Sequence, residues 1–592
     1  LVAGVMVSRA MARSLQQLAE TAVSIRDFDF TDRPRVQSAI QEVDELSRCL
    51  DEMRLTLGRF QEISHRVAQE EDLDRLTGQV LRDTVDIARA RSAILFLEEP
   101  DGFRAAAALF DGIFKDERGA ESLLQHLERL RVTEALRQGV SVTTDWTAHQ
   151  APEAVPSELA GQPHVLTVPL RVREGTQVGG LVLLGGTPFD ASRARFIENL
   201  SGFVSVSLET RELIRAQKAL FDAFVRLIAG AIDAKSPYTG GHCERVPVLT
   251  RMFVEAACAA TDGAYAEFEL TENDWEAVEL ASWLHDCGKV TTPEFVVDKA
   301  TRLETLYDRI HEVRTRFEVL KREAEVAAWK RIAEGGDSDA ILAGLREQWR
   351  DLDDDFRFVA ECNSGETCIS DEHAERLRRI AARTWTRTLD DRLGLGPEEA
   401  MRKAGAPLQP LPVEEPLLAD RSEHLIPHAR PVSYPAELNI TLPVPELLYN
   451  RGERPNLLVK RGTLTDEERF KINEHIIQTL VMLNELPFPA HLAQVPELAG
   501  GHHERMDGKG YPRSLCAADM NPVARMMAIA DVYEALTAGD RPYKPAKTKE
   551  QAMHIMGCMA GEGHLDPDLF ALFKDAGIPE RYAQMPTCGQ EA

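Results

Sequence analysis

The chain has 592 residues, and a prior of about 150 residues per domain predicts roughly three to five domains. Its hydrophobic content of 44% and charged content of 28% are ordinary for a folded protein and exclude wholesale disorder. The net charge of −27 argues against binding to nucleic acid polymers, which requires a basic face. Nine cysteines without a Cys-x-x-Cys pair predict neither a disulfide framework nor a thiolate zinc site.

The chain opens with an apolar run from Leu1 to Val7, which Arg9 and Arg13 follow. A membrane helix requires about 20 apolar residues. We therefore interpret the run either as the cytosolic end of a membrane helix that precedes this chain, or as a frayed apolar terminus. The first interpretation predicts a membrane-anchored protein on the cytoplasmic side of the inner membrane.

A heptad pattern follows, with apolar residues at alternating spacings of four and three: Ala39, Val43, Leu46, Leu50, Met53, Leu57 and Phe60. Such a seam predicts a parallel helical partner, and we expect a homodimer. A preceding helix from Ser8 to Ile25 and a connector with Pro34 complete an arrangement that resembles a HAMP signal-relay module. Any dimeric coiled coil would explain the pattern as well.

Residues 62–212 alternate helix and strand patterns. A helix from Leu73 to Ala88 is expected, and a closing helix from Ala191 is expected to continue to Ile232. The strands expected between them are Ser92 to Leu97, Val140 to Thr144, Val165 to Val172 and Gly179 to Leu184. This order resembles a GAF sensory domain, although a structural, dimerising role fits equally well. Because no cysteine lies between Cys49 and Cys243, a thioether-linked bilin is excluded.

The remaining sequence contains a set of histidines and aspartates in suggestive settings. His285 and Asp286 end an amphipathic helix, and His475 lies on a helix that starts with a capping box at Thr465. Asp531 lies in the middle of an apolar helical stripe, where a carboxylate is costly to bury unless a partner or a metal compensates it. Each residue alone has a structural explanation, but the whole set is improbable as chance. The candidate metal ligands are His242, His285, Asp286, His475, His502, His503 and Asp531.

Five imidazoles and two carboxylates without a thiolate suit iron, manganese, nickel or zinc, and they suffice for two adjacent ions that share a carboxylate. Two ions about 3.5–4 Å apart activate water and stabilise both attacking and leaving oxygens in phosphodiester hydrolysis. In a chain of net charge −27, that cationic centre would anchor an anionic substrate.

The order of these residues, together with Gly510-Tyr511-Pro512, resembles the HD-GYP phosphodiesterases, which hydrolyse cyclic di-GMP. The resemblance covers Leu220 to Lys299 and Val459 to Ile578. It implies an all-helical effector of the HD superfamily with two divalent ions, iron or manganese in the first place. It further implies that Lys289 contacts a phosphate and that Arg541 and Lys544 hold the substrate. Gly510 and Tyr511 would shape the substrate pocket and a surface for a diguanylate cyclase-type or other signalling partner.

Two features depart from the family pattern. Some members carry a Glu four residues before the first histidine as the ligand of a third metal; Tyr238 stands there, so a two-metal site is expected. An insertion at 300–460 separates Lys289 from the third histidine. It is expected to form long charged helices at Arg302 to Ile332, Ala340 to Glu361 and Asp371 to Leu389, before a Pro-rich, irregular segment. His311, inside the insertion, is rejected as a ligand because its spacing from the preceding leucine does not fit.

The sequence thus predicts a multidomain chain with a HAMP-like coiled coil, an α+β GAF-like domain, and an all-α effector with a helical insertion. The expected segments are 1–61 (relay), 62–212 (GAF-like), 213–299 (effector, first part), 300–460 (insertion) and 461–592 (effector, second part). The expected reaction is hydrolysis of cyclic di-GMP to linear pGpG, with possible further cleavage to GMP, and Asp286 and Lys289 as catalytic residues. The alternatives are a hydrolase of another cyclic dinucleotide or nucleotide, and a non-catalytic receptor or adaptor.

Overall fold

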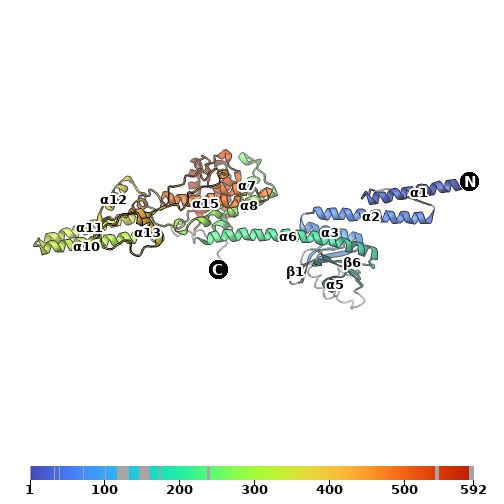
Figure 1. Cartoon of the computed structure of the whole chain (residues 1–592). Helices are drawn as coiled ribbons and strands as arrows, with labels where there is room; N and C mark the ends of the chain where they lie inside the picture. Colours follow the sequence, from blue (N-terminus) through green and yellow to red (C-terminus); the bar gives the residue numbers. More distant parts are fainter. Residues whose placement is uncertain are drawn as a thin grey trace. The chain divides into compact units, whose positions relative to one another are not determined.

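The computed structural model describes residues 2–31, 34–38, 40–70, 72–99, 102–115, 132–145, 161–172, 175–235, 241–539 and 546–585. Within them the chain divides into two compact units, Leu1–Phe221 and Asp222–Ala592 (Figure 1). The five segments expected from the sequence are a finer division, which stays a prediction. None of the described helices combines the length and the apolar character that crossing a membrane requires.

The first unit begins with two helices, α1 (Val2–Arg26) and α2 (Gln41–Gln69), joined by an extended connector. The Arg54 guanidinium on α2 donates to the carbonyl of Phe30 at 3.1 Å, near the start of the connector. Nearer the start of α2, the Ser47 hydroxyl donates to the carbonyl of Val36 at 2.8 Å. The connector therefore runs back along α2, so the two helices are parallel.

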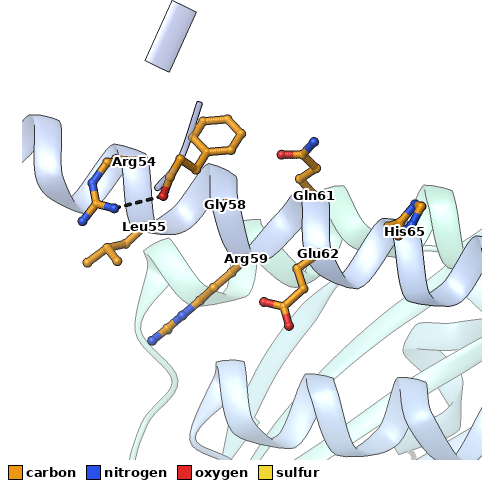
Figure 2. Close-up of a pocket in the computed structure, with 8 residues that line it drawn as sticks. Arg54, Leu55, Gly58, Arg59, Gln61, Glu62 and His65 are labelled. Carbon is orange, nitrogen blue, oxygen red and sulfur yellow. Dashed lines mark hydrogen bonds between the residues drawn. The ribbon is translucent and has the colours of Figure 1, made fainter. Parts of the chain in front are cut away.

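A pocket of about 510 Å³ lies beside α2, where the connector crosses it (Figure 2). Phe30 packs over Gly58 there, and a Cβ at Gly58 would lie 3.1 Å from the Cβ of Phe30. The helix–connector–helix arrangement is thus present, while its assignment as a HAMP module stays a prediction. Ala39, the first residue of the expected heptad seam, lies outside the described residues.

An antiparallel sheet in the order β3-β2-β1-β6-β5-β4 forms the rest of the first unit. Its strands are β1 (Ser92–Glu99), β2 (Gly102–Phe110), β3 (Ile113–Phe114), β4 (Val142–Asp145), β5 (His164–Arg171) and β6 (Gln177–Gly185). The helices are α3 (Leu73–Ala88), α5 (Val132–Gln138) and α6 (Ala191–Lys235). Leu76 of α3 and Leu200 of α6 pack in one core with the sheet, and Leu136 of α5 packs in a second core.

Four of these strands lie where the sequence predicts them, but β2 and the short β3 were not predicted. The sequence of β2 is rich in alanine, which is a weak strand former, so its pairing with β1 rather than local propensity makes it a strand. The closing helix α6 begins at Ala191 as expected and continues to Lys235.

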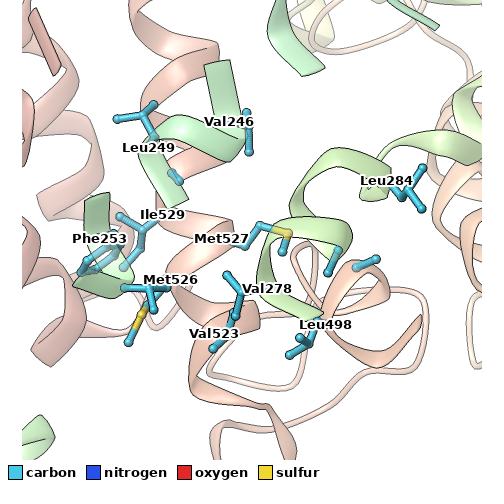
Figure 3. Close-up of a cluster of buried hydrophobic side chains, with 14 of the residues drawn as sticks. Val246, Leu249, Phe253, Val278, Leu284, Leu498, Val523, Met526, Met527 and Ile529 are labelled. Atoms are coloured by element: carbon cyan, nitrogen blue, oxygen red, sulfur yellow. The ribbon is translucent and has the colours of Figure 1, made fainter. Parts of the chain in front are cut away.

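The second unit contains a helical core assembled from two separated stretches of sequence. Its main helices are α7 (His242–Cys258), α8 (Glu272–Leu284), α15 (Asp466–Asn484), α16 (Val495–Gly500), α17 (Pro522–Thr537), α18 (Lys549–Gly561), α19 (Pro567–Asp575) and α20 (Ile578–Ala583). Figure 3 shows Phe253 of α7 and Val278 of α8 beside Met526 and Ile529 of α17. Residues before and after the insertion therefore share one core.

The insertion forms a projecting arm and two small sheets. Its elements are α10 (Ile310–Ala333), α11 (Ser338–Asn363), α12 (Asp371–Ala381), β7 (Thr384–Arg387), α13 (Pro397–Ala404), β8 (Val413–Pro416), β9 (Leu425–Pro427), β10 (Leu447–Asn450) and α14 (Glu453–Leu457). Figure 1 shows α10 and α11 side by side, extending away from α15.

Two of the helices expected in the insertion are shorter in the structure, so the insertion is not purely helical. The helix expected from Arg302 begins only at Ile310, where the Asp308 carboxylate accepts the Ile310 N–H. The helix expected to reach Leu389 ends at Ala381, because Thr384–Arg387 pairs with β8 instead. β-branched Thr384 and Thr386 and aromatic Trp385 favour that strand.

Arg302 joins the two ends of the insertion. Its side chain is fully buried, and its guanidinium donates to the carbonyl of Val459 at 3.1 Å, near the end of the insertion. It also donates to the carbonyls of Cys362, Ser364 and Thr367, at the end of α11 and in the loop that follows. One cation thus satisfies four backbone acceptors from two segments.

We predict that Arg302→Met lowers the free energy of unfolding of the second unit by about 3 kcal/mol, because four carbonyls lose their donor inside the protein. Urea unfolding, with hydrogen–deuterium exchange of residues 359–367, measures the effect. The matched control is Arg331→Met, which changes an exposed arginine on α10. Equal stability of the two variants would contradict the role assigned to Arg302.

Candidate metal centre

Five helical elements bring the seven candidate ligands together. His242 is the first residue of α7, His285 and Asp286 directly follow α8, and His475 lies in the middle of α15. His502 and His503 follow α16, and Asp531 lies on α17. The ligand atoms form three mutually close groups: His475, His502 and His503; His242, His285 and Asp531; and His285, Asp286 and His502. The seven side chains therefore form one cluster.

Asp286 lies between the two halves of this cluster. One of its carboxylate oxygens is 3.2 Å from His242 Nε2 and 3.3 Å from His285 Nε2. Its other oxygen is 3.2 Å from His475 Nε2. A carboxylate whose two oxygens face different imidazole groups has the geometry of a bridge between two metal ions.

Backbone carbonyls orient three of the histidines. The Nδ1 atoms of His285 and His502 each lie 2.7 Å from a carbonyl oxygen three residues earlier, and Nδ1 of His475 is close to the carbonyl of Ile472. These contacts place the proton on Nδ1 and leave Nε2 with a free lone pair that faces the cluster.

The atoms that face the centre of the cluster have the properties of vacant ligands. Four imidazole nitrogens and one carboxylate oxygen are buried and lack a hydrogen-bond partner among the described residues: Nε2 of His242, His285, His475 and His502, and Oδ1 of Asp286. Leaving such atoms without a partner costs about 1–3 kcal/mol each. A metal ion would satisfy several at once, so this donor set fits one or two divalent ions.

Glu534 belongs to the centre, and the sequence analysis missed it. It lies one helical turn after Asp531 on α17, is buried, and places one carboxylate oxygen 2.5 Å from His242 Nδ1. Its other oxygen accepts from Arg245 at 2.6 Å. Glu534 thereby orients His242 as the backbone carbonyls orient the other rings. Its spacing from Asp531 places it on the same face of α17, but this spacing alone does not distinguish it from an ordinary surface glutamate.

The surroundings shift the pKa values of the ligands in different directions. Burial and the neighbouring His285 lower the pKa of His502 to about 4, which keeps its imidazole neutral and able to bind a metal. At His242, burial is outweighed by the carboxylates of Asp286, Asp531 and Glu534, which raise its pKa well above the usual value. Without a metal, His242 therefore holds a proton that a metal ion must displace.

Gly288 allows the segment after Asp286 to lie directly on α15. A Cβ at this position would come within 1.9 Å of the carbonyl oxygen of His475. The Gly288 N–H donates to the Thr479 hydroxyl at 2.9 Å, and that hydroxyl donates to the carbonyl of His285 at 3.2 Å. The glycine therefore controls the distance between the Asp286 side and the His475 side of the cluster.

The segment around Gly510 folds over His503. Glu504 is buried and accepts the N–H groups of Arg513 and Leu515, at 2.7 and 2.9 Å, which closes this segment into a loop. The Tyr511 ring stacks on the His503 ring, with centroids 4.9 Å apart and planes 23° apart. Both rings are half-buried and, with Lys289 and Asp531, mark the side of the cluster that is open to solvent.

Lys289 contacts the bridging carboxylate. Its ammonium pairs with Asp286, and although burial opposes it, the charge of that carboxylate raises the pKa of Lys289. Arg541, Lys544 and Tyr238 lie outside the described residues, so their expected roles stay predictions. His311 is exposed on α10 and contacts Arg314, whereas His475 lies in the cluster.

Part of the second unit matches a known protein family. Residues 412–569 match the family described as HD domain. The matched range includes His475, His502, His503 and Asp531. The match begins after His242, His285 and Asp286, and the structure brings these together with the matched residues across the insertion. The second unit therefore contains an HD domain.

Curated relatives have similar segments. A 3′3′-cGAMP-specific phosphodiesterase of Vibrio cholerae is 34% identical over 133 residues, which are 22% of this chain and 28% of the relative. A cyclic di-GMP phosphodiesterase of Pseudomonas aeruginosa is 39% identical over 123 residues (21% and 28%). A cyclic di-GMP phosphodiesterase of Thermotoga maritima is 34% identical over 111 residues, which are 19% of this chain and 30% of the relative. The chain thus spans less than a third of the length of each of these relatives.

Solved structures with GAF domains also match part of the chain. The match with the GAF domain of an Acinetobacter phosphoenolpyruvate-protein phosphotransferase covers 27% of this chain and 96% of the solved chain. The sequence identity is 16% and the TM-score is 0.23. A GAF domain/HD domain protein from Geobacter sulfurreducens covers 25% and 98%, at 18% identity and a TM-score of 0.19.

We predict that Gly288→Ala reduces the metal content from about two ions per chain to one or none, because the added methyl group pushes Asp286 away from His475. Elemental analysis of the purified protein measures this content. Gly344→Ala on α11 is the matched control, since its Cβ would meet nothing within 4 Å. Full metal content in Gly288→Ala would contradict the role of the close approach.

The raised pKa of His242 predicts that metal affinity rises with pH. Below this pKa the imidazole is protonated, so metal uptake releases about one proton, and the apparent affinity rises up to about tenfold per pH unit. His502, which is already neutral, adds nothing to this slope above about pH 5. Calorimetric titration of Mn²⁺ in buffers of different ionisation enthalpy measures the released proton. Uptake without proton release between pH 6 and 8 would contradict the prediction.

Proposed function

We propose that this chain, which contains an HD domain similar to those of bacterial cyclic dinucleotide phosphodiesterases, is a metal-dependent phosphodiesterase that hydrolyses cyclic di-GMP to linear pGpG. The observation that carries the proposal is the position of Asp286, whose two oxygens face separate histidine groups at 3.2–3.3 Å. The names of the relatives from Pseudomonas aeruginosa and Thermotoga maritima support the substrate.

The chain's own residues account for binding and orientation. Two divalent ions held by the seven ligands would lower the pKa of a water molecule and stabilise the charge that develops on the phosphate oxygens. Lys289 is half-buried beside Asp286, so its ammonium can offset the charge of a phosphoryl oxygen on the open side of the cluster. Tyr511, stacked on His503, presents a ring edge to a base or sugar at the same opening. Gly510 shapes this part of the substrate pocket.

We propose that the two ions are iron or manganese, with nickel and zinc as compatible alternatives. Imidazole ligands suit iron and zinc, and carboxylates favour harder ions such as manganese. A site with five imidazoles, two carboxylates and no thiolate lies between these preferences. The buried, neutral His502 supports ions that accept nitrogen ligands.

A second candidate substrate is 3′3′-cGAMP. The relative from Vibrio cholerae that matches over 133 residues is named as specific for this dinucleotide. The two substrates differ in one base, and the metal cluster contacts the phosphodiester that they share. The residues that distinguish the bases therefore lie beyond the seven ligands.

We further propose a homodimer with a HAMP-like relay and a GAF-like sensor at its N-terminal side. In the single chain the seam residues Leu46, Met53 and Leu57 of α2 are exposed. Helix α6 carries a longer apolar stripe, in which Leu213, Leu220 and Leu227 recur every seven residues, as do Ile214, Phe221 and Ile228. Such repeats favour a parallel helical partner, and a second copy offers an identical stripe.

Attachment at the inner membrane, and a signalling partner at the loop with Gly510 and Tyr511, complete the proposal. The half-buried Tyr511 lies at the surface side of the centre, where a partner could reach it.

Manganese- or iron-loaded protein is expected to convert cyclic di-GMP to pGpG under anaerobic conditions, and Asp286→Ala is expected to lose at least about 100-fold in rate. Chromatography of the products, with 3′3′-cGAMP in parallel, measures both substrates. Asp262→Ala, at an exposed position after α7, serves as the control. Faster turnover of 3′3′-cGAMP would favour the second candidate, and no turnover of either by metal-loaded protein would sink the proposal.

The dimer is expected to dissociate when a charge enters the apolar stripe of α6. Leu220→Glu places a carboxylate in the proposed seam. The control Ala219→Glu places it about 100° around the same helix, on the side away from Phe221 and therefore outside the stripe. Analytical ultracentrifugation measures the mass of both variants and of the unchanged chain. A monomeric unchanged chain, or a dimeric Leu220→Glu, would contradict this interface.

A further inference from the structure

A loop of the insertion reaches the metal centre. Residues 428–446, called the strap here, leave strand β9 and return as strand β10, and the pairing of Leu447 with Pro427 holds the two ends together. Strand β10 lies against α15, the helix that carries His475. The strap contains four prolines, which limit the conformations open to it: Pro431, Pro435, Pro443 and Pro445.

The strap is anchored first on the loop that contains Tyr511. The N–H groups of Thr441 and Leu442 donate to the carbonyl of Pro512 at 2.9 and 3.3 Å. The Thr441 hydroxyl lies 3.2 Å from the same carbonyl and 2.8 Å from the Ser514 hydroxyl. The main chain immediately after Tyr511 is therefore bound to the strap.

The second anchor lies on α15, next to His475. The Tyr434 hydroxyl donates to one oxygen of Glu474 at 2.8 Å, and Lys471 pairs with the other oxygen at 2.6 Å. Glu474 is buried, so its carboxylate depends on these two partners. The strap thus contacts Glu474, which precedes His475. It also contacts Pro512, which follows Tyr511, the residue that stacks on His503.

These two rings belong to one group of ligands. The His475 ring meets the His503 ring edge to face, with centroids 5.2 Å apart. His475, His502 and His503 form one of the close groups, and His242, His285 and Asp531 form another. Among the described residues, no hydrogen bond or ion pair joins this second group to the strap. A shift of either anchor would change the relative orientation of His475 and His503 and leave the other group in place.

We propose that the strap is a positioning element for the metal position formed by His475, His502 and His503, with Thr441 and Tyr434 as its positioning residues. The inference rests on the proposed metal centre, but not on the identity of the substrate. It gives the insertion a role at that centre, because the arm formed by α10–α13 and the strap belong to the same inserted segment.

Cobalt binding tests the inference without turnover. The double variant Thr441→Val with Tyr434→Phe removes two hydroxyl groups and keeps the size of both side chains. We expect one of the two Co²⁺ ions to bind about tenfold more weakly, with a change in its visible absorption, while the other ion binds as before. The single variant Thr441→Ser, with Tyr434 unchanged, keeps both hydroxyl groups and is expected to keep the spectrum of the unchanged chain.

A matched double variant, Thr315→Val with Tyr307→Phe, controls for the loss of the same groups. Thr315 donates to the His311 carbonyl at 3.0 Å, and Tyr307 donates to Glu312, so both bonds lie within the arm. Unchanged cobalt binding in the strap variant would overturn the inference. The inference would also be overturned if both ions bound equally more weakly, or if the control variant showed the same effect. An unchanged chain that takes up no cobalt would overturn it as well.

The outcome is separable from that of the proposed function. If the strap variant binds one cobalt ion more weakly and the unchanged chain hydrolyses no cyclic dinucleotide, the positioning role stands and the proposed substrate is wrong. If the unchanged chain hydrolyses cyclic di-GMP and the strap variant binds both ions normally, the function stands and the positioning role fails.

Discussion

A buried carboxylate, Asp286, is the constraint on which the second unit depends. Its side chain is almost fully enclosed, and three imidazole nitrogens lie 3.2–3.3 Å from its oxygens. A charge in such a place is tolerated only when cations or hydrogen bonds compensate it. Burial opposes its ionisation, yet the charge of Lys289 lowers the pKa of Asp286 well below its usual value. The centre is thus built to keep this carboxylate ionised and accessible to metal ions.

The insertion interrupts this centre in sequence but not in space. Its two ends are joined by buried polar contacts at its base: Arg302 binds the carbonyl of Val459, and Lys299 binds both oxygens of Glu468 at 2.9 and 2.8 Å. Glu468 also completes the capping box that starts α15, so the entry to the insertion is fixed to the helix that carries His475. These contacts explain how residues on either side of 300–460 can form a single cluster. They also give the insertion a direct structural connection to the metal centre.

The seven candidate ligands could be selected from the sequence only as a set, because each residue alone has a structural explanation. The capping box at Thr465 and the apolar stripe around Asp531 both lie on helices that the structure confirms. Which of these residues lie together could be inferred only from the family pattern, since local periodicity carries no information about contacts across the insertion. Glu534 was missed because a glutamate one turn from Asp531 is ordinary on a helix surface; only its burial against His242 distinguishes it.

Other differences arose where pairing with another segment of the chain decides the local structure. Strand β2 contains four consecutive alanines and is a strand because it pairs with β1. The helix expected up to Leu389 stops at Ala381, since Thr384–Arg387 pairs with β8, which lies far along the chain. The strap was expected to be irregular, and its regularity is indeed low, but its contacts with Pro512 and Glu474 depend on side chains that no local pattern identifies.

The central claim is that Asp286 bridges two metal ions. Anomalous X-ray diffraction from crystals of manganese- or iron-loaded protein, recorded on both sides of the metal absorption edge, tests this claim directly. The account predicts two peaks about 3.5–4 Å apart, one beside each oxygen of Asp286. One should lie among His475, His502 and His503, and the other among His242, His285 and Asp531. A single peak, or two peaks that Asp286 does not contact, would contradict the account.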